Sequence, residues 1–241
     1  MWTYLAIFLS VAVLIGVFVR KYFLLDSNAL KKTDIQVDEH EDAPEKKRIR
    51  RDDKEKMEKL FKRGESLLNS GKDEEAIKCF VQILAIDALH TESQHKLALL
   101  YLQKQMYGAA AALFKQLSEA APDPVHFSHL GLALFHQKDF EGAKSAYQKA
   151  LDLDPSRPQR FVSLSQVYKA MGNFQNAVVA LNKAIEMDKE NMEVLFLLAD
   201  VQEEMGNTEE ACEILNRVLE MAPENEDAKS LLKDVIENKE T

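Results

Sequence analysis

Residues 124–157 read PVHFSHLGLALFHQKDFEGAKSAYQKALDLDPSR, and this stretch decides the fold. Gly131, a small residue, precedes Ala143 by twelve places, and the bulky Tyr147 follows that alanine by four. The apolar spacing predicts two amphipathic helices of about a dozen residues each, joined by a short turn. The two small residues allow these helices to cross closely, and the bulky residue fills the space against the next unit.

The same pattern recurs along the chain at a nearly constant interval of about 34 residues. The alanines and their bulky partners are Ala76/Phe80, Ala110/Phe114, Ala143/Tyr147, Ala177/Leu181 and Ala211/Leu215. The small residues twelve places before these alanines are Gly64, Ala98, Gly131, Ser165 and Ala199. Prolines at 122, 155 and 223 fall where a second helix should stop and the next one begin.

These positions resemble the tetratricopeptide repeat, whose unit has this same length. The resemblance implies an all-α, right-handed α-solenoid over residues 56–225, with repeats at 57–90, 91–123, 124–157, 158–191 and 192–225. Repeat one departs from the pattern at Arg63 and Ala88, where an apolar residue and proline are usual. Residues 226–241 are predicted to form a capping helix with a polar outer side, which a solenoid end needs.

The N-terminal residues 2–19, WTYLAIFLSVAVLIGVFV, carry no formal charge. As a helix they would extend about 27 Å, close to the thickness of a bilayer's hydrocarbon core. We expect a single-pass transmembrane anchor over residues 1–21. The alternatives are a cleaved signal peptide and a buried core helix. Basic residues follow the span at Arg20, Lys21, Lys31 and Lys32, so the N-terminus is expected outside and the body in the cytoplasm.

Residues 22–55 are rich in charge and poor in apolar side chains, which predicts a flexible linker. Its basic block, Lys46 to Arg51, would suit anionic lipid or nucleic acid, but acidic neighbours on both sides favour a solvated charge run. Residues 1–56 hold 11 basic and 10 acidic side chains, which leaves 20 basic and 30 acidic ones for residues 57–241. Because so acidic a body repels phosphate, we expect no nucleic-acid partner.

The sequence offers no catalytic constellation: it has no Gly-rich phosphate loop, no HExxH and no nucleophile elbow. Cys79 and Cys212 fall in second helices beside apolar residues and read as small hydrophobes. Histidines gather at 126, 129 and 136, with His95 one repeat earlier. A zinc site there would need a ligand from another helix, so we predict groove or surface histidines, no metal, no cofactor and no enzymatic activity.

In tetratricopeptide arrays the first helices line a concave groove, and the resemblance implies a peptide-binding role for the residues at those positions. They are Phe61, His95, Leu99, Leu102, Ser128, Leu132, Phe135, Gln166, Lys169, Phe196, Asp200 and Glu203. Repeats two and three present an apolar strip, and repeat five is acidic, which suits an amphipathic helix or extended segment with a basic flank. Because periodicity alone does not separate groove from core, some of these residues are alternatively core residues.

The family's carboxylate clamp, which grips chaperone C-termini with Lys, Asn and Arg, is not matched. Its expected positions hold Phe61, Glu65, Val125 and His129. Binding of such tails is therefore disfavoured.

The anchor, the linker and the array together predict a membrane-tethered adaptor that binds protein or peptide partners and no small-molecule substrate. The layout resembles bacterial inner-membrane assembly factors such as lipopolysaccharide assembly protein B, without that protein's paired CxxC knuckle, so assembly or quality control of a membrane complex is the expected role. Mitochondrial outer-membrane import receptors for amphipathic presequences share the layout and are an alternative. A metal-dependent regulator built on the histidines and a self-associating scaffold are two further alternatives.

Overall fold

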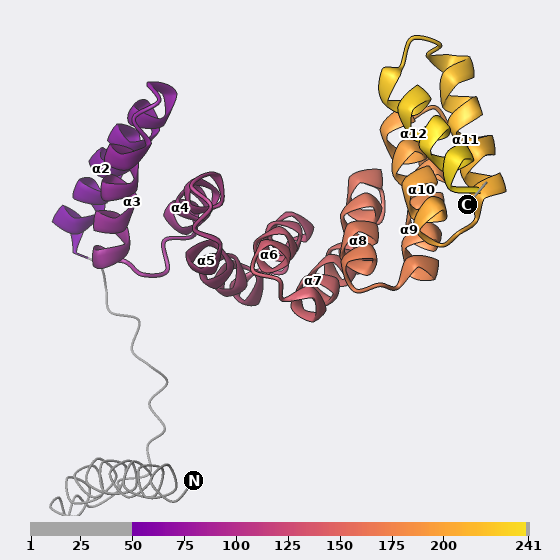
Figure 1. The fold of residues 1–241 in the computed structure, drawn as a ribbon. Helices are drawn as coiled ribbons and strands as arrows, with labels where there is room; N and C mark the ends of the chain where they lie inside the picture. Colours follow the sequence, from indigo (N-terminus) through magenta and orange to yellow (C-terminus); the bar gives the residue numbers. More distant parts are fainter. Residues whose placement is uncertain (1–49, 240–241) are drawn as a thin grey trace, which may run out of the picture. The chain divides into compact units, whose positions relative to one another are not determined.

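The computed structural model describes residues 50–239, which lie in the compact unit formed by residues 49–241 (Figure 1). The described residues form eleven α-helices and no strand. The helices are α2 (Arg51–Asn69), α3 (Asp73–Ile86), α4 (Thr91–Gln103), α5 (Tyr107–Ala120), α6 (Pro124–His136), α7 (Phe140–Leu153), α8 (Pro158–Ala170), α9 (Phe174–Met187), α10 (Met192–Glu204), α11 (Thr208–Met221) and α12 (Glu226–Lys239). This part of the chain is an all-α solenoid.

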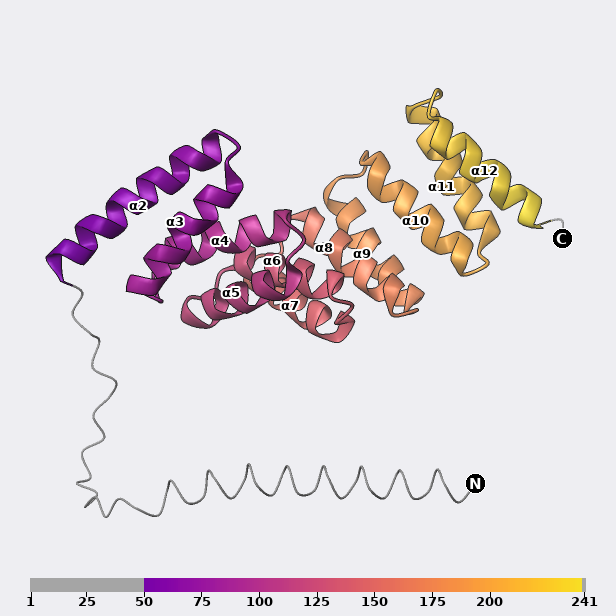
Figure 2. The same ribbon diagram turned by 60° about the vertical axis from the view of Figure 1, so that its left-hand side comes forward.

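Each helix packs on the next along the chain, and α6 also touches α8 while α10 touches α12. In Figure 1, α4, α6 and α8 lie on the inner side of the curve, and α5 and α7 lie on its outer side. The turned view in Figure 2 shows α2 lying against α3 as a hairpin. Contacts are therefore local in sequence, as expected for a repeat array.

The close helix crossings depend on the small and bulky residues that recur in the sequence. Phe80, Phe114, Leu181 and Leu215 are completely buried, and Tyr147 is nearly so. A Cβ added to Gly131 would lie 2.9 Å from the Tyr147 ring, which is closer than atoms can pack. The small residue therefore sets the distance between α6 and α7.

The turn inside each helix pair ends in a residue with a left-handed backbone. Glycine provides it at 71, 172 and 206, with φ of 71°, 72° and 78°. Gln105 and Lys138 adopt the same conformation, with φ of 59° and 64°. In each turn the next residue's N–H donates back into the preceding helix, as Asn173 does to the Tyr168 carbonyl at 2.8 Å. This bonding satisfies carbonyls that a helix end leaves free.

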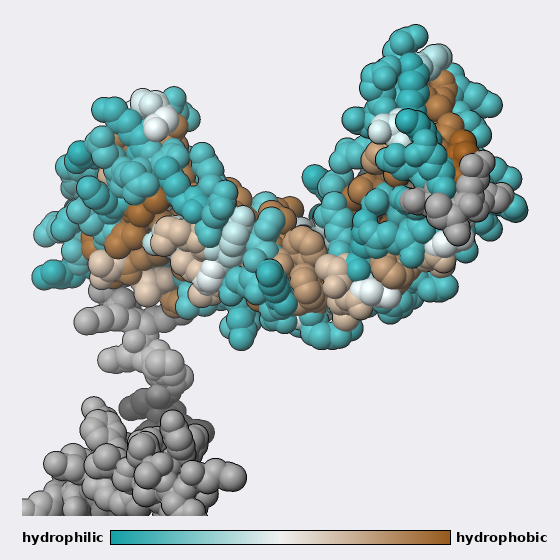
Figure 3. All heavy atoms as spheres, viewed as in Figure 1, coloured by the Kyte–Doolittle hydropathy of each residue, from teal (hydrophilic) through white to brown (hydrophobic). Residues whose placement is uncertain are grey.

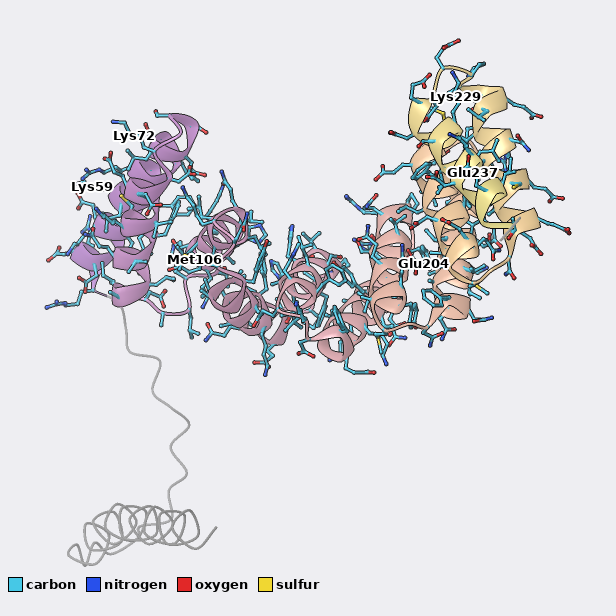
Figure 4. The ribbon with its side chains drawn as sticks, in the orientation of Figure 1. Lys59, Lys72, Met106, Glu204, Lys229 and Glu237 are labelled. Carbon is cyan, nitrogen blue, oxygen red and sulfur yellow. The ribbon has the colours of Figure 1, made fainter. Side chains whose placement is uncertain are left out.

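Helix α12, the last of the described helices, has two different faces. Ala228 and Val235 are buried against α10 and α11, whereas Ile236 is 47% exposed. Figure 3 shows an apolar strip over α11 and α12, and Figure 4 shows Lys229 and Glu237 on α12.

Within residues 50–239 no helix combines the length and the apolar character that crossing a bilayer requires. The predicted anchor at residues 1–21 and nearly all of the predicted linker lie outside the described residues.

Candidate functional site

A pocket of about 480 Å³ lies between α6 and α8, which are first helices of two neighbouring pairs. It is open to solvent, and residues of α6, α7 and α8 line it together with the residue before α8. The lining residues are Val125, Ser128, His129, Leu132, Tyr147, Arg157, Gln159, Arg160, Ser163 and Gln166. We call this space the α6–α8 pocket.

Two chemically different walls face each other across the α6–α8 pocket. On α6, Val125 and Leu132 are 37% and 38% exposed, although both are aliphatic. On α8, Gln159 and Gln166 are exposed, and their side chains make no hydrogen bond with other described residues. The members of each pair stand seven residues apart, so they lie about two turns apart on one face of their helix. One wall thus offers apolar contact and the other offers amide donors and acceptors.

Arg160 is the buried cation of the pocket, with only 5% of its surface exposed. Its guanidinium donates to the Asp154 backbone carbonyl, to Asp154 Oδ2 at 2.6 Å and to Ser128 Oγ at 3.3 Å. Hydrogen bonds from Ser156 and Arg160 hold the pKa of the Asp154 carboxyl well below its usual value. Asp154 therefore neutralises Arg160, and the network ties α6 to the start of α8.

A cluster of three half-buried histidines connects α4 to α6. His126 Nε2 lies 3.1 Å from His95 Nδ1, and the His129 ring stacks on Phe114 with centroids 5.0 Å apart. The Nδ1 atoms of His126 and His129 are buried without a hydrogen-bond partner. His136 is separate, because its ring stacks on Tyr107. His95, His126 and His129 are each half-buried, and His129 also lines the α6–α8 pocket.

Burial shifts the pKa of two histidines of this cluster, His129 and His95. It lowers the pKa of His129 to about 4, and the neighbouring His95 and His126 add to the effect. Burial also lowers the pKa of His95, with smaller contributions from His126 and Lys96, while Asp123 opposes the shift. His95 and His129 are therefore held neutral near pH 7. Among residues 50–239 no group of three or more His, Cys, Asp or Glu side chains has an arrangement that would hold a metal ion.

The acidic end of the predicted groove is partly neutralised. Lys169 pairs with Asp200 and, at 2.9 Å, with Glu204, which Figure 4 shows on α10. Burial would lower the pKa of Lys169, but hydrogen bonds from its ammonium to the two carboxylates raise it overall. These three side chains join α8 to α10, so two of the carboxylates are less available to a basic ligand than the sequence suggests.

The predicted groove residues divide into three groups in the structure. Ser128, Leu132 and Gln166 line the α6–α8 pocket. Phe61 and His95 line a second pocket of about 420 Å³, whose lining also includes Glu65 and Lys96, an ion pair at 3.3 Å.

The remaining predicted residues contribute mainly to packing or to ion pairs. Leu99, Leu102, Phe135 and Phe196 are half-buried and pack against core clusters. Lys169 and Asp200 pair with each other, and Glu203 is half-buried on α10. Five of the predicted residues thus line two pockets, and the other seven contribute to packing or ion pairs or are half-buried.

Sequence reasoning missed Arg157, Gln159, Arg160 and Ser163 as pocket residues. Val125 was noted only because it stands where a carboxylate clamp would place another residue, whereas His129 was noted for that reason and as one of the clustered histidines. The one available signal was the position within the repeat. Gln159 stands one repeat length after Val125, and Gln166 stands one repeat length after Leu132.

Comparison with known families now identifies the chain. A family model described as the cilia and flagella-associated protein 70 C-terminal domain matches residues 27–241. The chain belongs to this family. It is a tetratricopeptide repeat protein, as the repeat pattern predicted, and its fold is generally a non-enzymatic scaffold for protein interactions. No curated protein matches the sequence.

Solved tetratricopeptide structures share the fold at low identity. MamA 41-end from Desulfovibrio magneticus RS-1 is 16% identical with a TM-score of 0.66, covering 71% of this chain and 97% of that one. YrrB, described as a protein with an unusual peptide-binding site, is 18% identical with a TM-score of 0.64 over 72% of this chain and 90% of its own. A thermophilic tetratricopeptide protein of Thermus thermophilus is 20% identical with a TM-score of 0.53, covering 75% and 98%. These similarities show the fold alone.

Proposed function

We propose that the chain is a membrane-anchored adaptor that binds a peptide segment of a protein partner in the α6–α8 pocket. The observation that carries the proposal is the pair of solvent-exposed aliphatic side chains, Val125 and Leu132, facing two unbonded glutamines. An exposed apolar surface bordered by free amide groups suits an extended peptide, whose backbone needs hydrogen-bond partners. The partner is expected to belong to a membrane complex that the adaptor helps to assemble or monitor.

A crosslinking pull-down from native membranes tests the binding site. Val125→Lys/Leu132→Lys places two charges on the apolar wall, and we expect it to release partners that the wild-type chain retains. Both side chains are substantially exposed, so the substitutions should leave the fold intact. Phe135 is unsuitable as a target because it packs against the core around Tyr147.

The matched control is Val179→Lys, which adds a charge at a valine that is 59% exposed on α9. It should retain every partner. If the double variant also retains all partners while keeping its helical circular dichroism, the α6–α8 pocket is not the binding site. Recovery of basic amphipathic presequences as the released partners would instead support the import-receptor role.

The membrane anchor is proposed from residues 2–19, which are uncharged and long enough to cross a hydrocarbon core. Alkaline carbonate extraction of membranes tests it. The full chain should stay in the pellet, and a chain lacking residues 2–19 should move to the supernatant. Retention of the shortened chain in the pellet would contradict the anchor.

A further inference from the structure

We propose that the α6–α8 pocket selects an extended peptide carrying an aliphatic side chain and, about three residues away, a carboxylate that Arg157 binds. The inference rests on the proposed function, since it assumes that a peptide occupies this pocket. The inference adds that the bound peptide is negatively charged. The acidic repeat five, in contrast, suggests a ligand with a basic flank.

The charge lining the pocket is positive. Arg157 and Arg160 are its charged lining residues, and no Asp or Glu lines it. Arg160 is buried and already paired with Asp154. Arg157 is exposed and makes no ion pair with any described residue. In an otherwise acidic chain, the pocket therefore presents one unpaired guanidinium, a group that binds carboxylates through two parallel hydrogen bonds.

The geometry of the walls fixes the spacing in the ligand. Val125 and Leu132 are about 10 Å apart along α6, because seven residues of helix rise that far. Gln159 and Gln166 repeat this spacing on α8, and Arg157 lies next to α8's first residue, at the same end of the pocket as Gln159. An extended peptide advances about 3.3 Å per residue. A side chain resting on Leu132 is therefore about three residues from a carboxylate that reaches Arg157.

The amide wall explains why the ligand should be extended. Free Gln159 and Gln166 side chains each carry a donor and an acceptor, which match the N–H and C=O of an extended backbone. A helical ligand would keep these backbone groups bonded internally. The N-terminal end of α8 also carries partial positive charge beside Arg157, which adds to the attraction for a carboxylate.

A random nine-residue phage-display library, panned against the full-length chain, tests the inference. Sequences enriched on the wild type and lost on Val125→Lys/Leu132→Lys define pocket ligands. We expect them to carry Asp or Glu about three residues from Leu, Ile or Val. Panning against Arg157→Glu should enrich Lys or Arg at the acidic position, and panning against Arg157→Lys should keep the acidic preference.

Fluorescence anisotropy of one enriched peptide gives the magnitude. Replacing its acidic residue with the corresponding amide should weaken binding to the wild type by about fivefold, as for an exposed ion pair, and should have no effect on Arg157→Gln. The control Lys183→Glu reverses a charge on α9 and should leave both the affinity and the acidic preference unchanged.

The two hypotheses fail in different ways. If no enrichment depends on Val125 and Leu132, the proposed function itself is wrong and the inference falls with it. If enrichment depends on them but shows no acidic preference, or if Arg157→Glu leaves the preference unchanged, peptide binding stands and the role of Arg157 is overturned.

Discussion

Gln105 and Lys138 adopt a left-handed backbone at turn positions where the other helix pairs have glycine, namely Gly71, Gly172 and Gly206. A side chain in this conformation clashes with the local backbone and costs about 1–2 kcal/mol, whereas glycine avoids the clash. Glycine also loses about 0.5–1 kcal/mol more conformational entropy on folding. The first effect is larger, so these two turns carry a small local strain.

Gln105→Gly and Lys138→Gly should each raise the free energy of unfolding by about 0.5–1 kcal/mol, because they remove this strain. Urea denaturation followed by circular dichroism measures the change. The matched control is Gly172→Ala, where an added Cβ meets no atom within 4 Å and only the backbone conformation changes. Gly172→Ala should lower the free energy of unfolding. If it does not, or if the two substitutions to glycine do not raise the free energy of unfolding, backbone strain is ruled out as the cause.

His129 should make the array sensitive to acid. Its folded pKa of about 4 lies below the ordinary value of 6.5, so the unfolded chain takes up a proton more readily. The contribution of neutral His129 to the free energy of unfolding is complete above pH 6.5. It decreases as the pH falls towards 4 and is absent below that. The shift corresponds to at most about 3 kcal/mol before screening by solvent is allowed for.

Urea denaturation at pH 7 and pH 4.5 should therefore show a smaller loss of stability for His129→Leu than for the wild type. Because carboxylates also titrate in this range, only the difference between the two chains is informative. His136→Leu, outside the histidine cluster, should retain the wild-type acid sensitivity. Identical pH dependence in wild type and His129→Leu would exclude His129 as the source.

At the scale of helices, the distance between the two members of a pair depends on one small residue. Gly131 allows α6 to approach the buried ring of Tyr147, and Gly64 plays the same part for Phe80. Glycine inside a helix ordinarily lowers its stability relative to alanine. Here the close crossing more than compensates, since any Cβ would push the two helices apart.

Gly131→Ala should destabilise the chain by about 1–3 kcal/mol, despite the better helix propensity of alanine, because the new Cβ overlaps a ring that cannot move away. The control is Gly108→Ala in α5, where the nearest atom would be Gln137 Oε1 at 3.9 Å. That substitution should stabilise the chain by up to about 1 kcal/mol. Thermal denaturation of both variants would reveal the opposite signs, and a stabilising Gly131→Ala would contradict the packing argument.

At the scale of the whole described unit, α12 is the last described helix, and two partly exposed lysines, Lys229 and Lys233, lie on it. Lys233 stands one repeat length after Ala199, at the position where each helix pair has a small residue for close crossing. Leu219, Leu232 and Ile236 border a surface pocket beside Lys229 and Lys233. The two lysines therefore stand where a further helix would pack, and they keep this apolar end in water.

Lys229→Leu/Lys233→Ala should cause concentration-dependent association, because it leaves an apolar face with room for a close helix crossing. Sedimentation equilibrium would show a rising average mass. The effect should increase with salt, since residues 192–241 carry 14 acidic and 4 basic side chains that repel a second copy. The control Lys183→Ala, which removes a lysine from α9, should associate no more than the wild type. If the double variant also associates no more than the wild type, Lys229 and Lys233 do not prevent association through α12.

The sequence by itself determined the helical solenoid and the crossing points within it. Small and bulky residues such as Gly131 and Tyr147 recur at a fixed interval, and the packing they specify is between neighbours in the chain. The tertiary structure alone decided which side chains share the α6–α8 pocket and which histidines meet.

Gln159 and Leu132 belong to different helix pairs, and His95 and His126 are 31 residues apart. Whether such residues meet depends on the rise and rotation from one helix pair to the next. That geometry is the sum of many packing contacts, and no single residue or interval in the sequence encodes it.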